Sequence, residues 1–475
     1  MKSVWGNIHK GLIETLPVEV LVLSTFAIVL VALGFWIIYA KGGLGKYRYG
    51  TESCLSTDVD ELFPKRYAFL DGVRGIAIIL VMVFHVWQQS WMWPTFYIGN
   101  FEINLNHFAV VGYMGVEALF VLSGFCLFLP FAKACFTKGQ FKFPVLDFYK
   151  KRLIRILPSY LLSMVILLAF DKTVYIGTGW TMVKNILSHL MFVSNYSVLN
   201  GGSYINAVYW SLAVEIQFYL LFPLIASLMK KWPHITTFAV SMLANSYRAY
   251  ILVFEPDKLT ALFNLLPGMI DMFVLGMYGS WWAMRLRAGT ASLENKRRRI
   301  HTYIMTSGFV VLTLLLCSIM YWHNGFVYTD TGYTVVSPTQ MFQTLIRPTW
   351  GMVVVLQMIC GVFLINWVEK IFANPFNVFI ARISLNLYLW HQWIAVKLRV
   401  NNVLYYDAIR YSSNQYDPNW SKNAFWISII LSIFVACLIT YLWDEPVTSA
   451  LIKRFVKPKD KTMAETQSER VTQLS

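Results

Sequence analysis

Long apolar runs recur along the whole chain and are separated by shorter polar stretches. A helix needs roughly 20 consecutive apolar residues to cross the hydrocarbon core of a bilayer, so each run of that length predicts one membrane span. Eleven spans are predicted, at residues 17–40, 74–93, 109–132, 153–170, 208–229, 234–254, 262–286, 301–322, 345–367, 376–399 and 424–446. A shorter apolar stretch at 180–194 is expected to lie at the interface or to re-enter the membrane. The pattern predicts an all-α polytopic membrane protein.

The first predicted span lies near the N-terminus, where an apolar run can also be a secretory signal peptide. Residues 17–40 form a run of 24 residues without a small-x-small cleavage site, which predicts a retained membrane anchor. We therefore divide the chain into an anchor with a cytoplasmic linker at 1–65, a membrane domain at 66–455 and a polar tail at 456–475. The tail is expected to be disordered because it has few apolar residues to bury.

Basic residues fall in every second loop between the predicted spans. Loops 41–66, 133–155 and 285–299 are rich in Lys and Arg, whereas loops 94–108 and 323–344 contain neither. Because cytoplasmic loops carry the excess of positive charge, this alternation predicts an outside N-terminus and a cytoplasmic C-terminus. Of the 475 residues, 57% are hydrophobic and 14% charged, and the formal net charge is +15. In this setting the charge indicates topology and contact with anionic membrane lipids rather than binding of nucleic acid.

Motifs for metal, phosphate or dinucleotide binding are absent from the sequence. The six cysteines fall in predicted spans or cytoplasmic loops, so no disulfide framework is expected, and no CxxC pair indicates a metal site. We expect no metal and no glycine-rich nucleotide loop. The chemistry should therefore depend on polar side chains inside the membrane, each of which costs several kcal/mol unless it is paired or faces a cavity.

The second predicted span carries an arginine and a histidine, Arg74 and His85, in an otherwise apolar run. Eleven residues amount to about three helical turns, so both side chains leave one helix face about 16 Å apart along the axis. Asp71 lies close to the same line. Taken singly, Arg74 could be an interfacial anchor and His85 a contact between helices. Together they predict that this face lines a polar site or path.

Three later spans also carry polar side chains at helical spacing. They supply Glu117 with Ser123, then Trp210, Ser211, Glu215 and Tyr219, and then Ser384, Tyr388 and His391. Further ionisable residues are expected to be embedded or interfacial, namely Arg248, Asp271, Arg347 and Arg382. A structural hydrogen bond is the alternative for each residue, but the set exceeds what helix packing requires.

Six motifs in order carry a family resemblance: "LDGVRGIAIILVMVFH", "GVEALFVLSGF", "FYKKRLIRILPSYLL", "YWSLAVEIQFYLLFP", "ISLNLYLWHQ" and "LWDEP". They resemble the motifs of the bacterial integral-membrane acyltransferase-3 family, which includes cell-surface glycan O-acetyltransferases. The resemblance runs from about residue 66 to 455. Two features depart from the family pattern: the span at 17–40 precedes its ten typical helices, and the position of Glu117 is often aspartate there.

The resemblance implies transfer of an acyl group, usually acetyl, from cytoplasmic acyl-CoA to a hydroxyl of an extracytoplasmic glycan or lipid-linked sugar, in the bacterial plasma membrane. Arg74, Arg152 and Arg155 are expected to hold the CoA phosphates, although ordinary positive-inside charge also explains the last two. His85 is expected to act as general base. Attack could be direct or proceed through an acyl-histidine intermediate.

The resemblance also suggests roles for other intramembrane residues. Glu117 or Glu215 could orient the His85 ring or bind sugar hydroxyls, and the sequence does not choose between them. The candidate substrate contacts are Trp210, Tyr219, Ser123 and His391. Because the polar tail is short, the chain is expected to complete acylation without an added extracytoplasmic domain. The acceptor stays open among O-antigen, exopolysaccharide, peptidoglycan and a small molecule.

The main alternative is a secondary transporter of a small polar solute, which would also have many spans and buried charges. Arg382 or Asp271 could then serve a substrate or proton path. Transporter folds often show repeats between halves and paired glycine- or proline-broken helices. Neither pattern is evident in this sequence. A catalytically inactive scaffold is a third hypothesis, against which His85 argues weakly.

Overall fold

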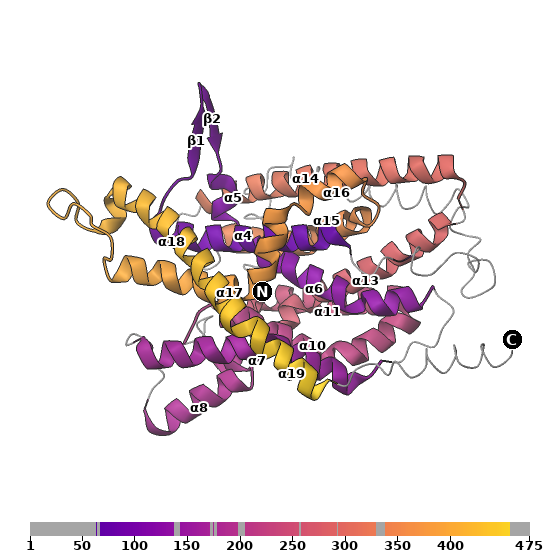
Figure 1. The fold of residues 1–475 in the computed structure, drawn as a ribbon, viewed down its shortest axis with the longest axis horizontal. Helices are drawn as coiled ribbons and strands as arrows, with labels where there is room; N and C mark the ends of the chain where they lie inside the picture. The colour runs from indigo at the N-terminus through magenta and orange to yellow at the C-terminus, as the bar shows by residue number, and fades with distance from the viewer. Residues whose placement is uncertain are drawn as a thin grey trace.

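A computed structural model describes residue 63 and residues 67–136, 143–171, 174, 178–197, 205–255, 258–291, 293–328 and 338–456. The predicted span at 17–40 and the predicted tail beyond residue 456 lie outside the described residues. The described part is a bundle of α-helices with one β-hairpin (Figure 1).

Among the described residues, ten long helices form the bundle, and each overlaps one of the ten predicted spans from 74–93 onward. They are α4 (Ala68–Ser90), α6 (Met114–Ala134), α7 (Val145–Phe170), α10 (Tyr209–Lys231), α11 (Pro233–Phe254), α13 (Leu266–Ala291), α14 (Asn295–Tyr328), α15 (Pro338–Gly361), α17 (Pro375–Val400) and α18 (Pro418–Ile439). The short helices are α5 (Asn106–Val110), α8 (Gly179–Leu190), α9 (Ser194–Ser197), α12 (Leu259–Phe263), α16 (Asn366–Phe372) and α19 (Glu445–Phe455). A 3-10 turn, η2, spans Asn414–Tyr416, and a π-helical segment, η3 (Thr440–Asp444), joins α18 to α19.

Seven helical segments within the described residues are long and apolar enough to cross a membrane. Six of them comprise α4, α6, α7, α10 and most of α13 and α14, and the seventh runs from α18 through α19. Helices α11, α15 and α17, which occupy three further predicted spans, are not among the seven. The chain is thus an all-α polytopic membrane protein, while the count of eleven spans and the orientation stay predictions.

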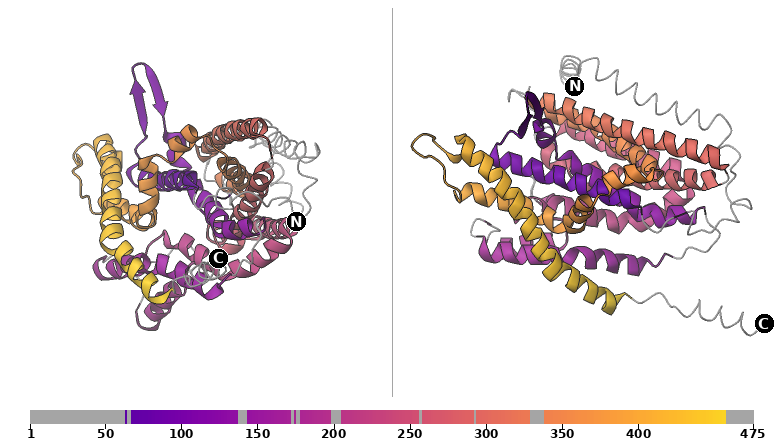
Figure 2. Two further views of the ribbon diagram at one scale, coloured as in Figure 1. Left: turned by 45° about the vertical axis from the view of Figure 1, so that its right-hand side comes forward. Right: turned by 45° about the horizontal axis from the view of Figure 1, so that its top comes forward.

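Most of the bundle helices run roughly side by side, and the α18–α19 segment crosses the others obliquely (Figures 1 and 2). A small hairpin of β1 (Thr95–Ile98) and β2 (Phe101–Asn104) projects sideways from the bundle, pointing upward in Figure 1. Its strands pair antiparallel, and Gly99 in the turn has a φ of +61°. The hairpin lies in loop 94–108, for which the apolar pattern predicted no regular structure.

Helices α6 and α13 cross without space for side chains at the crossing point. A Cβ atom added to Gly124 would lie 1.9 Å from the carbonyl oxygen of Phe273, and one added to Gly276 would lie 2.0 Å from that of Val121. Each glycine therefore lets its helix contact the other backbone directly, as small residues do between membrane helices.

Replacing Gly124 by valine is expected to destabilise the fold by about 1–3 kcal/mol or more, because the obstructing Phe273 atom is backbone and cannot rotate away. The melting temperature of the purified protein in detergent measures this effect. Gly308→Ala is the matched control, since its added Cβ would meet only the Cys360 sulfur, at 3.3 Å. Equal melting temperatures for Gly124→Val and the wild type would contradict the close crossing.

Helices α4 and α17 also lie against each other and run in the same direction. Near their starts, a Cβ added to Gly75 would lie 2.5 Å from the carbonyl oxygen of Asn377. Further along, His85 of α4 reaches His391 of α17. This parallel pair therefore brings the two histidines together in the second half of both helices.

Candidate active site

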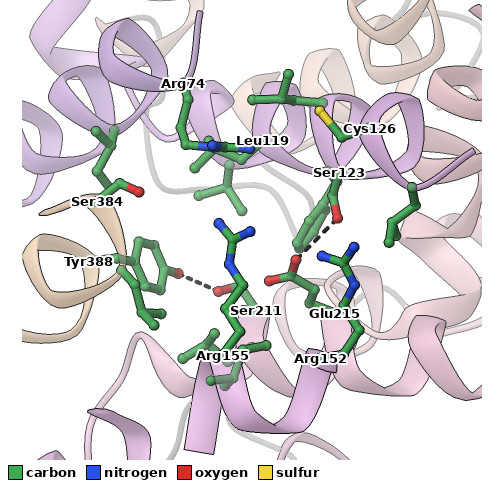
Figure 3. Close-up of a pocket in the computed structure, with 18 of the residues that line it drawn as sticks. Arg74, Leu119, Ser123, Cys126, Arg152, Arg155, Ser211, Glu215, Ser384 and Tyr388 are labelled. Carbon is green, nitrogen blue, oxygen red and sulfur yellow. Dashed lines mark hydrogen bonds between the residues drawn. The ribbon is translucent and has the colours of Figure 1, made fainter. Parts of the chain in front are cut away.

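Five helices, α4, α6, α7, α10 and α17, line a cavity of about 150 Å³. Its wall combines apolar side chains with a concentrated polar set (Figure 3). The polar and thiol members are Arg74, Ser123, Cys126, Arg152, Arg155, Ser211, Glu215, Tyr219, Ser384 and Tyr388. The predicted polar stripe of α10, with Ser211, Glu215 and Tyr219 at intervals of four, faces the cavity as a unit.

Positive charge dominates the described lining of the cavity. Figure 3 shows Arg74 approaching from one side and Arg152 and Arg155 from the other. With Glu215 as the carboxylate in the described lining, three guanidinium groups and one carboxylate leave an excess of two positive charges. Such a site, walled by apolar side chains, attracts an anion.

Arg152 is held beside aromatic rings but is not saturated with hydrogen bonds. Its guanidinium lies 5.6 Å from the ring centre of Phe148 and 5.7 Å from that of Tyr219. Its buried Nε atom has no hydrogen-bond partner among the described residues. Arg74 has a long ion pair with Asp71, at 3.6 Å. Both arginines therefore retain capacity to bind an anionic ligand.

Glu215 is anchored by two hydroxyl groups inside the cavity. Ser123 donates to its Oε1 atom at 3.1 Å, and the Tyr219 hydroxyl donates to the same oxygen. Nearby, the hydroxyls of Ser211 and Tyr388 are 2.5 Å apart. The sequence prediction that Glu215, Ser123 and Tyr219 belong to one polar site is thus met by their geometry, while their roles in binding or catalysis stay predictions.

His85 lies beyond the cavity lining and is paired with a second histidine. Its Nδ1 atom is 3.0 Å from the Val81 carbonyl oxygen and 3.0 Å from Nε2 of His391. His391 is fully buried, and its ring centre is 5.8 Å from that of Tyr388, which does line the cavity. Tyr388 therefore adjoins both the arginine-lined cavity and the histidine pair.

Among the described residues, neither Glu117 nor Glu215 forms a hydrogen bond with the His85 ring. Glu117 instead accepts a hydrogen bond from Nε of Arg347 at 2.7 Å, and both side chains are almost fully buried. Glu117 and Ser123 are six residues apart on α6, so they leave the helix about 120° apart and only Ser123 reaches the cavity. The hydrogen-bonding neighbours of the His85 ring are the Val81 carbonyl and His391, and a role for Glu117 or Glu215 in orienting the ring stays a prediction.

A second buried ion pair lies among the residues that the sequence left unassigned. Arg248 donates to both carboxylate oxygens of Asp271, at 3.0 and 2.6 Å. Arg347 and Glu117 form the other pair, so the two embedded arginines are matched by two embedded carboxylates. The ion pair with Arg347 gives Glu117 a structural partner, and its catalytic role stays a prediction.

Trp210 lies outside the described cavity lining and packs edge-on against Phe120, with ring centres 6.4 Å apart. Its predicted stacking on a sugar stays a prediction. His391, a predicted substrate contact, has an exposed fraction of zero and lies behind His85. Of the two rings, His85 is partly exposed and His391 is not.

A family model described as an acyltransferase domain matches residues 67–442. The Staphylococcus aureus (strain COL) protein named "Putative O-acetyltransferase SACOL0978" is 25% identical over 358 residues, which cover 68% of this chain and 49% of that protein. The protein named "O-acetyltransferase OatA" of Staphylococcus aureus (strain NCTC 8325 / PS 47) is 27% identical over 180 residues, or 36% of this chain and 26% of its own. The chain spans about half the length of the first of these relatives. No solved structure matches it significantly. With a match over most of its length, this chain belongs to the acyltransferase-3 family of membrane acyltransferases.

Proposed function

We propose that this protein is an O-acetyltransferase of the bacterial plasma membrane. It moves an acetyl or other acyl group from cytoplasmic acyl-CoA to a hydroxyl of an extracytoplasmic glycan or lipid-linked sugar. The observation that carries the proposal is the arrangement of an arginine-lined cavity beside the pair of His85 and His391. The O-acetyltransferase names of two relatives agree with it.

The cavity arginines are suited to the donor because CoA carries several phosphate groups. Guanidinium groups bind phosphate oxygens through forked, charge-assisted hydrogen bonds. Arg74, Arg152 and Arg155 come from two helices and approach one space, and the orphaned Nε of Arg152 is a donor that a phosphate oxygen would satisfy. Binding there would neutralise the excess positive charge.

In this proposal His85 is the base, and its position on the same helix face as Arg74, about 16 Å further along the axis, supports that role. The long pantetheine arm of CoA separates the phosphates from the thioester, so phosphates at Arg74 allow the thioester to lie near His85. His85 takes the proton of the acceptor hydroxyl while the oxygen attacks the thioester carbonyl. The C–S bond then breaks, and the proton passes to the CoA sulfur to give the ester and free CoA.

Removing the phosphate contacts is expected to weaken donor binding. The double variant Arg152→Gln and Arg155→Gln should raise the KM for acetyl-CoA by about 10-fold or more, since a hydrogen bond to a charged group contributes about 1.5–3 kcal/mol. The assay is transfer of radiolabelled acetyl to an acceptor glycan by protein in liposomes with acetyl-CoA added on one side.

Arg382→Gln is the matched control for loss of charge. Arg382 is more than half exposed, lies outside the cavity lining and donates to Glu445 at 2.6 and 2.8 Å. Its KM for acetyl-CoA should equal that of the wild type. An unchanged KM in the double cavity variant, or no transfer by the wild type with any glycan tested, would overturn the proposal.

A further inference from the structure

The hydrogen bonds of His391 determine which of its ring nitrogens holds a hydrogen. Its Nδ1 atom lies 2.8 Å from the carbonyl oxygen of Leu387, one turn earlier on α17. A carbonyl oxygen only accepts hydrogen bonds, so Nδ1 of His391 must carry the hydrogen. In the neutral ring, Nε2 is then an acceptor, and this is the atom that faces His85.

The surroundings of His85 determine its tautomer in the same way. Its Nδ1 atom is 3.0 Å from the Val81 carbonyl oxygen and 3.0 Å from the acceptor nitrogen Nε2 of His391. Both neighbours are acceptors, so Nδ1 of His85 carries the hydrogen and donates it to them. The other nitrogen, Nε2, then keeps its lone pair and is the basic atom of the ring.

We propose that His391 is a positioning residue that holds His85 in the tautomer with a basic Nε2 atom and stabilises the cation that forms when that atom takes a proton. This inference rests on the proposed role of His85 as base. The unequal burial of the two rings agrees with it, because His391 is fully buried and His85 is partly exposed. The accessible ring meets the acceptor, and the buried ring supports it.

The pair can also share the proton that His85 receives. After Nε2 of His85 binds the hydroxyl proton, the hydrogen on its Nδ1 can shift toward Nε2 of His391 over the 3.0 Å contact. The positive charge then rests partly on His391, whose Nδ1–H still donates to Leu387. Reversal of the shift returns the proton for delivery to the CoA sulfur. A neutral imidazole such as that of His391 can share the proton in this way, whereas a carboxylate in its place would be a buried charge without a partner until the proton arrived.

Two substitutions of His391 separate positioning from packing. His391→Phe keeps a ring but removes the acceptor, and His391→Gln places an amide oxygen about where Nε2 lies. We expect kcat for acetyl transfer to fall about 100-fold or more in His391→Phe, since a misplaced catalytic histidine tautomer is severely limiting. The KM for acetyl-CoA should stay within about twofold. His391→Gln should recover at least about 10-fold of the loss, because its oxygen can accept from His85.

His189→Phe is the matched control for loss of a buried imidazole. His189 is also fully buried and contacts the carbonyl oxygen four residues earlier, Asn185, at 2.7 Å. Its kcat should match the wild type per folded molecule. In nitrogen-15 NMR of histidine-labelled protein in lipid, the signal of an unprotonated Nε2 should be assigned to His85 by its loss in His85→Ala, and His391→Phe should split that His85 signal between two tautomers.

The outcomes distinguish this inference from the proposed function. If the wild type transfers acetyl, His85→Ala does not, and His391→Phe keeps the wild-type kcat, then the positioning role fails while the base survives. The positioning role would also be overturned if His391→Phe and His391→Gln lost kcat equally and the nitrogen-15 signal of His85 did not change. Packing alone would then explain the loss of kcat. If His85→Ala keeps full activity, the proposed function itself fails.

Discussion

Replacing His85 by alanine is expected to lower the rate of acetyl transfer by about 10²- to 10⁴-fold, the range that general acid–base catalysis contributes. The expected cause is loss of the atom that takes the hydroxyl proton, not loss of donor binding, because the arginine-lined cavity lies elsewhere on the helix face. Single-turnover transfer of labelled acetyl in liposomes measures the rate, and equilibrium binding of acetyl-CoA measures the affinity separately.

His234→Ala serves as the control for this experiment. His234 is exposed on α11, where its Nδ1 is 2.7 Å from the Tyr278 hydroxyl, and it is not part of the described cavity lining. It should transfer acetyl at the wild-type rate. A His85→Ala protein that loses donor affinity in proportion to its rate would show that His85 binds acyl-CoA instead of activating the acceptor.

Replacing Glu117 by glutamine is expected to destabilise the protein by about 3–5 kcal/mol, because it leaves the buried Arg347 cation without its counter-ion. The side chains of both residues are at most 3% exposed, and Nε of Arg347 donates to Oε1 of Glu117 at 2.7 Å. Chemical denaturation in detergent micelles, followed by tryptophan fluorescence, gives the change in unfolding free energy.

Removing both charges should recover most of the lost stability, since a buried ion pair can often be replaced by apolar residues at little cost in unfolding free energy. The double variant Glu117→Gln with Arg347→Met is therefore expected to be more stable than Glu117→Gln alone. The exposed pair of Arg382 and Glu445 is the control, and Glu445→Gln should cost at most about 1 kcal/mol. A Glu117→Gln protein with wild-type stability and a much lower transfer rate would instead support the catalytic role suggested by the sequence.

Spacing along a single helix predicted which side chains share a face. Ser211, Glu215 and Tyr219 were placed on one stripe of α10, and all three line the cavity. The same reasoning put Arg74 and His85 on one side of α4, where Arg74 faces the cavity and His85 meets a neighbouring helix. Periodicity succeeds here because rotation per residue is a property of the helix alone.

Contacts between helices could not be predicted in this way. His391 was one member of a stripe with Ser384 and Tyr388, yet it turns to His85 while the other two line the cavity. Glu117 shares a motif with Ser123 but pairs with a residue 230 positions away. Which helix a given face meets depends on packing of the whole bundle, and a single sequence carries no direct signal of it.

The contact of Gly75 with the Asn377 backbone has a consequence for the rate of reaction. It sets the axial alignment of α4 against α17, and His85 follows ten residues, or about 15 Å, later on α4. A slip of one helical turn between these helices would move the rings by about 5.4 Å, well beyond the 3.0 Å that joins them. Natural variation at a glycine that touches no substrate would therefore tune turnover while every reactive group is retained.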